Sequence, residues 1–334
     1  MPDRPDNRQM RGVVEALQRG DRFLLAGHVD PDPDCVGSLL ALDWALRSLG
    51  KTSVPVVTDP SSPNWDFLPH RQRLRSPEQV HRSEWESIVV VDGDLRRAGI
   101  VAEWAQTARL VINIDHHPTN SSSGTIRLLD PEASATGELI YALIAALDLH
   151  LNADAATLLY TAIVSDTGSF RFSNATERSL RIAADLVGYG AKPDYVAKHL
   201  YETHSWGYMR FLQRALQALE RSEDGRVAWI SLSHDLLTSE CMRPEETEGL
   251  VQYPRMIEGV ELAIIFRETS PQEVRVSFRS KNRLDVSALA AQLGGGGHAR
   301  AAGCRLFLPL EQARATVLAR VSETLKKQMS TQEA

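Results

Sequence analysis

The stretch RFLLAGHVDPDPDCVGSLLALDWALRSL (residues 22–49) joins an apolar run to a helical pattern through an acidic turn. Residues 22–27 lack polar alternation, which is typical of a strand buried on both faces. Residues 39–49 carry apolar side chains at helical spacing. A strand followed at once by a helix is half of the unit from which parallel sheets are built. This stretch therefore predicts an α/β domain.

The same alternation continues through the first half of the chain. Further strands are expected at 53–58, 87–91 and 110–114, and helices at 135–147 and 153–164. Strands without alternation, separated by helices, predict a parallel sheet covered by helices on both faces.

The pattern changes after about residue 190. A connecting helix is expected at 208–220, followed by the second set of elements: strands at 227–233, 261–268, 273–280 and 304–308, and helices at 286–293 and 312–327. The run EVRVSFRS alternates, as a strand with one wet face should. We therefore expect an N-terminal domain over residues 1–190, a helical linker over 191–224 and a smaller mixed-sheet α/β domain over 225–330.

Composition limits the classes of function. The 334 residues are 43% apolar and carry a net charge of −6, which argues against a protein that coats long nucleic acid. No apolar run approaches the roughly 18 residues of a membrane helix, and the polar N-terminus lacks a signal peptide, so a cytoplasmic location without membrane association is expected. Residues 271–305 hold six basic and two acidic residues, a local patch that suits a small anion.

The acidic turn carries a histidine and three aspartates between the expected strand and helix. A helix start usually needs one capping acid, whereas His28, Asp32 and Asp34 crowd a proline-stiffened turn here. Carboxylates and imidazole suit divalent ions such as manganese, iron or zinc, and a bound cation would relieve the repulsion between the acids. The alternative is an acidic surface loop with a helix cap.

Other metal-type side chains follow later elements. Asp92 directly follows the strand at 87–91, Asp115-His116-His117 follows the strand at 110–114, and Asp166 follows the helix at 153–164. Ligands of open parallel sheets bind beyond the carboxyl ends of the strands, so these residues are expected at one edge. Asp94 is an alternative to Asp92 as the metal ligand after the strand at 87–91. We prefer Asp92, because Asp92 directly follows the strand.

Six of these side chains are the expected metal ligands: His28, Asp32, Asp34, Asp92, His116 and Asp166. Six ligands are too many for one ion that keeps an open position for chemistry. Two ions that share a bridging carboxylate fit better, and such pairs clamp the attacking and leaving oxygens of a displacement. The hypothesis is phosphoryl transfer to water.

A glycine-rich run, Gly294 to Gly303, forms the second signature. Glycines let backbone N–H groups approach an anion closely. His298 and the upstream Arg279-Ser280 could add donors to a phosphate. The alternative is a linker or a helix C-cap.

Taken together, the sequence resembles the DHH/DHHA1 phosphoesterase superfamily over about residues 20–325. The motifs that carry the resemblance are His28-x-x-x-Asp32-x-Asp34 with Gly37-Ser38, Asp92, Asp115-His116-His117, Asp166-Thr-Gly-x-Phe170, Arg279-Ser280 and Gly295-Gly296-Gly297-His298-x-x-Ala-Ala-Gly303. The sequence departs from the family pattern at Pro33, where glycine is common, and at Asp30, an additional acid.

The resemblance implies a role for each matching position. It implies two divalent cations, usually manganese, with His28 and Asp32 on one, Asp34, His116 and Asp166 on the other, and Asp92 between them. His117 would face the scissile phosphate, and Asp115 would orient His116. The substrate's nucleotide end would be bound by Arg279, Ser280, Gly295, Gly296, Gly297 and His298.

The two-domain length is similar to that of the oligoribonuclease and phosphatase branch of the superfamily. That branch implies hydrolysis of short RNA oligonucleotides to mononucleotides, together with removal of the 3′-phosphate from 3′-phosphoadenosine 5′-phosphate. A cyclic or linear dinucleotide phosphodiesterase, for example one for cyclic di-AMP, would carry identical motifs. An inorganic pyrophosphatase would lack the glycine-rich motif. A nucleotide-binding module without activity would lack one of the six metal-ligating residues, and all six are present. The oligomeric state is left open, a homodimer included.

Overall fold

The computed structural model describes residues 7–121, 124–239, 244–281 and 284–332. The chain divides into two compact units, residues 1–203 and residues 204–334. The segment expected to be a helical linker is shared between them. Val196 is buried in the core of the first unit, and Phe211 is buried in the second.

The described part of the first unit contains a five-stranded parallel sheet in the order β2-β1-β3-β4-β5. Its strands are β1 (Arg22–Ala26), β2 (Thr52–Val56), β3 (Ser87–Val91), β4 (Leu110–Asp115) and β5 (Ile126–Leu129). The first four were expected from their apolar runs, whereas β5 is short and its run IRLL is interrupted by an arginine. The predicted parallel-sheet domain is confirmed.

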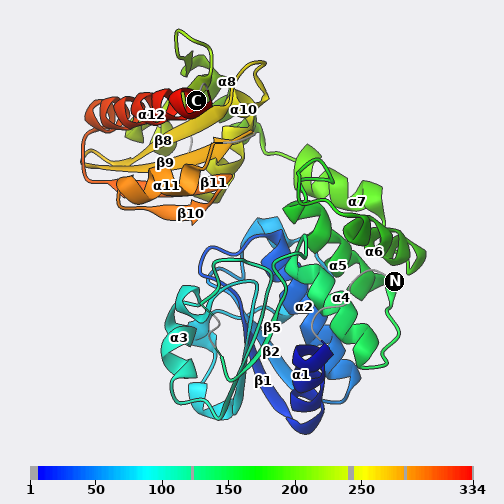
Figure 1. The fold of residues 1–334 in the computed structure, drawn as a ribbon. Coiled ribbons are helices and arrows are strands. Elements are labelled where there is room, and N and C mark those ends of the chain that lie inside the picture. The colour runs from blue at the N-terminus through cyan, green and yellow to red at the C-terminus, as the bar shows by residue number, and fades with distance from the viewer. Residues whose placement is uncertain (1–6, 122–123, 240–243, 282–283, 333–334) are drawn as a thin grey trace. The chain divides into compact units, whose positions relative to one another are not determined.

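Helices cover both faces of this sheet (Figure 1). The helices of the first unit are α1 (Asn7–Arg19), α2 (Pro33–Ser48), α3 (Ile100–Ala105), α4 (Thr136–Ala146), α5 (Ala153–Asp166), α6 (Glu177–Gly188) and α7 (Pro193–Ala197). Short 3-10 turns lie at Pro63–Trp65, Arg71–Arg73, Pro77–Gln79, Arg82–Glu84 and Leu95–Arg97, and a π-helical turn at Lys198–Glu202. The larger core lies between the sheet and α1, α2, α4 and α5, and the smaller one includes Val101 and Ala105 of α3.

Helix α2 begins earlier than its apolar pattern predicted. Asp32 caps it, because its carboxylate accepts a hydrogen bond from the Cys35 N–H at 2.9 Å, and Pro33 occupies the first turn. The first turn contains polar residues, so apolar spacing alone did not predict the start of the helix. Asp34 therefore lies inside the helix rather than in the preceding turn.

Gly37 lets α2 and α5 cross closely. A Cβ atom at this position would lie 2.6 Å from the Leu158 carbonyl oxygen. We expect Gly37→Ala to lower the free energy of unfolding by about 1–3 kcal/mol through overpacking, measured by urea denaturation. Gly188→Ala in α6 is the control, because nothing lies within 4 Å of a Cβ there. An equal effect of both substitutions would contradict the close crossing.

The described part of the second unit contains a six-stranded mixed sheet in the order β10-β11-β9-β8-β7-β6. Its strands are β6 (Leu219–Arg221), β7 (Val227–Leu232), β8 (Leu262–Ser270), β9 (Glu273–Ser280), β10 (Gly296–His298) and β11 (Ala301–Leu306), with β7 and β8 parallel and the other pairs antiparallel. Its helices are α8 (Trp206–Gln217), α9 (His234–Ser239), α10 (Gln252–Met256), α11 (Val286–Gln292) and α12 (Leu310–Gln332), with a 3-10 segment at Pro244–Val251. The mixed-sheet prediction is confirmed.

Helix α12 is the one described helix in this unit with the length to cross a bilayer, at 23 residues. Its sequence carries charged residues throughout, including Glu311, Arg314 and Arg320. Within the described residues, no helix combines the length and the apolar character that a membrane span needs.

Candidate metal centre

Three adjacent strands end beside one another at the candidate site. His28 follows β1, Asp92 follows β3, and Asp115 ends β4, with His116 and His117 directly after it. The sheet order places β1, β3 and β4 side by side, and parallel strands present their carboxyl ends at the same edge. The sequence expectation that these residues share an edge is met by the fold.

Two further carboxylates reach this edge from helices. Asp34 comes from the first turn of α2, and Asp166 is the last residue of α5. Asp34 accepts hydrogen bonds from the backbone N–H groups of Thr136 at 2.7 Å and Gly137 at 3.0 Å. These two amides begin α4, so the N-terminus of that helix holds the Asp34 carboxylate in place.

The imidazole of His116 lies among three carboxylates. Its Nε2 atom is 3.5 Å from Asp166 Oδ2, 3.7 Å from Asp92 Oδ1 and 3.9 Å from Asp34 Oδ2. These separations exceed hydrogen-bond length. Two ligands that each lie about 2.1 Å from one cation are themselves roughly 3 Å or more apart, so the spacing leaves room for an ion.

His28 joins the same arrangement from β1. Its Nε2 atom lies 3.6 Å from Asp92 Oδ2, on the other oxygen of the carboxylate that faces His116. Below, the carboxylate–histidine cluster means His28, Asp34, Asp92, His116 and Asp166. Among the described residues, three groups have ligand atoms within 4.8 Å of one another: His28, Cys35 and Asp92; Asp92, His116 and His117; and Asp34, His116 and Asp166.

The cluster fits divalent cations on two further observations. First, Asp92 Oδ2 and His28 Nδ1 are buried without a hydrogen-bond partner among the described residues, although buried polar atoms are normally paired. Second, burial and the charges of Asp92 and Asp166 hold the pKa of Asp34 well above its usual value, and burial raises the pKa of Asp166 to about 7. A cation would remove the cost of ionising these carboxylates together.

Asp92 occupies the centre of the cluster in a constrained backbone conformation. Its φ angle is +60°, in the left-handed region, and its N–H donates to the Ile114 carbonyl at 2.9 Å. Despite its burial, the imidazoles of His28, His116 and His117 hold its pKa well below the usual range. The neighbouring Asp94 accepts instead from Arg96 and Ser121, which engages it outside the cluster.

Asp32 is placed differently from the other expected ligands. It is exposed, and its Oδ1 atom is engaged as the cap of α2. It does not belong to any of the three groups of potential ligands found among the described residues. The structure therefore brings five of the six expected ligands together, whereas Asp32 is engaged as the cap of α2.

The pairing of Asp115 differs from the one that the resemblance implied. Asp115 Oδ1 lies 2.7 Å from His117 Nδ1 and accepts the His117 backbone N–H at 3.1 Å. His116 Nδ1 instead lies 3.1 Å from the Ala133 carbonyl. The expectation that Asp115 orients His116 is wrong, because an aspartate turns readily onto groups two residues ahead. Although burial opposes it, Asp115 together with Asp92 raises the pKa of His117 to about 9.

The expected substrate residues of the second unit are only partly brought together. Arg279 and Ser280 are successive residues of β9 and therefore point to opposite faces. Ser280 is buried, and its hydroxyl donates to the Ala299 carbonyl at 3.4 Å. The side chain of His298 lies outside the described part of the structure.

Part of the glycine signal has a packing cause. A Cβ atom on Gly295 would lie 2.1 Å from the Gly303 carbonyl oxygen, and one on Gly297, at φ +142°, would lie 2.5 Å from Ala302 Cα. Gly296 has nothing within 4 Å of that position. Gly295, directly before β10, and Gly297, within it, therefore allow this segment to lie against β11, whether or not they also bind a ligand.

Strand register reveals a basic row that the motifs did not single out. Arg267, Arg275 and Arg305 lie directly opposite one another across β8, β9 and β11. Opposed residues of antiparallel strands share a face, which is also the face of Arg279. Three of the basic residues of the stretch 271–305, namely Arg275, Arg279 and Arg305, thus share one face of this sheet with Arg267.

Sequence reasoning missed several residues that shape the site. The Thr136 hydroxyl donates to Asp92 at 2.9 Å, and the signal for it was only a threonine at a helix start. Arg178 binds Glu138 at 2.6 Å and Asp130 at 2.9 Å, and so braces the segment that presents Ala133 to His116. Contacts between segments this far apart leave no pattern in a single sequence.

Comparisons with known proteins agree with this arrangement. Residues 22–163 match the "DHH family, N-terminal domain", and residues 234–327 match the "DHHA1 domain". A protein from Thermus thermophilus, named bifunctional oligoribonuclease and PAP phosphatase NrnA, is 34% identical over 323 residues, which is 96% of this chain and 95% of that one. This chain belongs to the DHH family.

Two other known proteins are similar to this chain, one in sequence and one in structure. The cyclic-di-AMP phosphodiesterase PdeA of Listeria monocytogenes is 25% identical over 314 residues, which cover 89% of this chain but 46% of that one. The crystal structure of an exopolyphosphatase-related protein from Bacteroides fragilis superposes with a TM-score of 0.89 over the full length of both chains, at 23% identity. This likeness shows that the two chains share a fold.

Proposed function

We propose that this chain hydrolyses short RNA oligonucleotides to nucleoside monophosphates and also removes the 3′-phosphate from 3′-phosphoadenosine 5′-phosphate. The observation that carries the proposal is the convergence of His28, Asp92 and His116 at the ends of three adjacent strands. The name of the Thermus thermophilus relative, which matches over nearly the full chain, supports these two substrates.

The proposed cofactors are two divalent cations held by His28, Asp32, Asp34, Asp92, His116 and Asp166. The mixed carboxylate and imidazole set suits manganese. Bound cations supply charge stabilisation to the phosphate that is transferred. His117 is proposed to contact the scissile phosphate, and Asp115 to hold the His117 ring in position at 2.7 Å.

The second unit is proposed to bind the substrate through Arg279 and the backbone of Gly295 to Gly297. We expect Arg279→Ala to raise KM for a dinucleotide about tenfold and to leave kcat within about twofold, because a charge-assisted contact to phosphate is lost. Steady-state kinetics separate the two constants. Ser231→Ala, on β7 of the same sheet, serves as a control for general disturbance of the unit. A fall in kcat with an unchanged KM would contradict the binding role.

The dinucleotide phosphodiesterase is the second candidate. The relative that carries that name is less similar, and this chain spans less than half of its length. The short-oligonucleotide function is therefore favoured. A homodimer and a cytoplasmic location remain part of the proposal.

The test is hydrolysis by the purified protein with manganese. A 5′-labelled RNA dinucleotide, an RNA 24-mer, 3′-phosphoadenosine 5′-phosphate and cyclic di-AMP are compared side by side. Rapid loss of the dinucleotide with slow loss of the 24-mer supports the proposal, and phosphate release tests the second activity. A preference for cyclic di-AMP favours the second candidate. No turnover of any of the four refutes both.

A further inference from the structure

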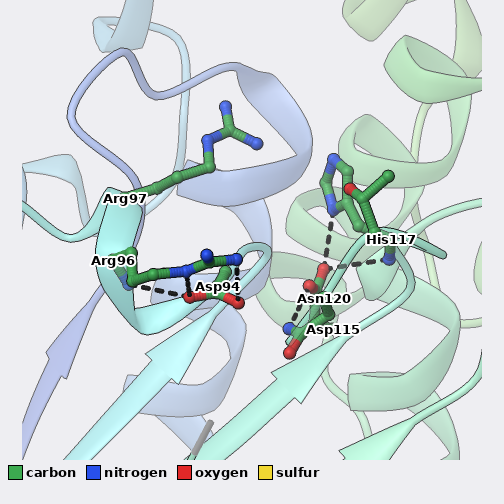
Figure 2. Close-up of a pocket in the computed structure, with 7 residues that line it drawn as sticks. Asp94, Arg96, Arg97, Asp115, His117 and Asn120 are labelled. Carbon is green, nitrogen blue, oxygen red and sulfur yellow. Dashed lines mark hydrogen bonds and ion pairs between the residues drawn. The ribbon is translucent and has the colours of Figure 1, made fainter. Parts of the chain in front are cut away.

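A pocket of about 300 Å³ lies in the first unit beside His117. It is lined by the last residue of β4 and by residues that follow β3 and β4, namely Asp94, Arg96, Arg97, Asp115, His117, Thr119 and Asn120 (Figure 2). His117 also faces the carboxylate–histidine cluster, because its Nδ1 atom is 3.8 Å from Asp92 Oδ1. The pocket is therefore adjacent to the cluster, and His117 lies between them.

Both carboxylates in the pocket have partners of their own. Asp94 accepts from Arg96 Nε at 3.0 Å and Nη2 at 3.2 Å, and from the Ser121 backbone N–H at 2.7 Å. Asp115 is held by His117 at 2.7 Å and by Asn120 at 2.5 Å. These contacts tie the two loops together and fix the walls of the pocket. The negative charge of Asp94 is therefore compensated by Arg96, and the Asp115 carboxylate is engaged by His117.

Arg97 differs from Arg96 in this respect. Its side chain is exposed and makes no hydrogen bond or ion pair with any described residue. In Figure 2, dashed lines join Arg96 to Asp94, whereas none reaches Arg97. The backbone below it is anchored, because the Arg97 carbonyl accepts the Val29 N–H at 2.9 Å, directly after His28. The pocket thus presents one uncommitted guanidinium from a fixed position next to the cluster.

We infer that Arg97 binds a second, non-scissile phosphate of the substrate, next to the phosphate that is cleaved. This inference rests on the proposed function. A guanidinium matches phosphate through paired hydrogen bonds, and Thr119, which also lines the pocket, adds a hydroxyl donor. The volume is at the lower end for ligand pockets, so it suits a phosphate with part of its sugar rather than another whole nucleotide.

The test compares three RNA dinucleotides, ApA, pApA and ApAp, which share one scissile ester and differ in a terminal phosphate. We expect the wild-type protein to have a lower KM for one of the phosphorylated forms than for ApA. Arg97→Ala should raise that KM about tenfold and leave the KM for ApA within about twofold, whereas Arg97→Lys should keep part of the preference. Arg109→Ala is the matched control, since Arg109 is exposed and precedes β4, at the opposite edge of the sheet.

Two results would overturn the inference: an equal effect of Arg97→Ala on all three dinucleotides, or a wild-type protein without any preference. If the wild-type protein cleaves none of them, the proposed function fails, and the inference is decided separately by equilibrium dialysis of the same three compounds. Tighter wild-type binding of a phosphorylated form, lost in Arg97→Ala, supports the subsite. Equal binding of the three, or a preference that survives Arg97→Ala, refutes it.

Discussion

Asp92→Asn is expected to reduce kcat/KM by ~1,000-fold or more and to remove most of the bound manganese. Asp92 is buried, and its two oxygens face His116 at 3.7 Å and His28 at 3.6 Å, so it links both halves of the cluster. Asparagine keeps the shape but loses the charge, and loss of one preorganised electrostatic partner alone costs ~10²–10³ in rate. Asparagine also tolerates the left-handed backbone at this position.

Activity is measured together with metal content and with thermal unfolding in the presence and absence of manganese. Ligands that bind only the native state raise the unfolding temperature, so the wild-type protein should be stabilised by manganese and the variant much less. Asp30→Asn is the control, because Asp30 is an exposed acid of the turn between β1 and α2 and is not in the carboxylate–histidine cluster. Near-normal turnover by metal-loaded Asp92→Asn would refute the assignment.

The sequence predicted the sheet well because its strands are continuous apolar runs. The expected bounds of β1, β3 and β4 agree with the observed ones within a residue or two, so the apolar pattern alone places His28, Asp92 and Asp115 at strand ends. β5 was missed because Arg127 interrupts a strand of four residues. The residues at the carboxyl ends of parallel strands can thus be predicted from one sequence, provided that the strands are buried on both faces.

The partners within the site could not be predicted in the same way. Whether Asp115 turns to His116 or to His117 depends on the backbone after β4, and adjacent histidines give no periodic signal. Thr136 reaches Asp92 across 44 positions of the chain, and the glycines at 295 and 297 serve strand pairing that only the register reveals. Spacing identifies candidate ligands, but the hydrogen bonds that aim them arise from tertiary packing.

His117→Ala is expected to lower kcat by ~10²–10⁴, the range typical of a group that donates or accepts a proton or hydrogen bond in the transition state. Metal content should stay close to that of the wild-type protein, because the other two ligand groups remain intact. Asp115→Asn should lower kcat by ~10–100-fold, as loss of a residue that orients another usually does. Both variants are checked for folding by thermal unfolding, since Asp115 also binds Asn120.

The double variant, which combines His117→Ala with Asp115→Asn, tests whether Asp115 acts through His117. If the only catalytic effect of Asp115 is to hold the His117 ring, then removing it from a protein that already lacks the ring should cost nothing further. The kcat of the double variant should therefore equal that of His117→Ala within about threefold. Multiplied losses would mean that Asp115 acts independently, for example by shaping the loop through Asn120, and would contradict the proposed pairing. The cycle thus tests the one contact in which the structure departs from the expected roles of this motif.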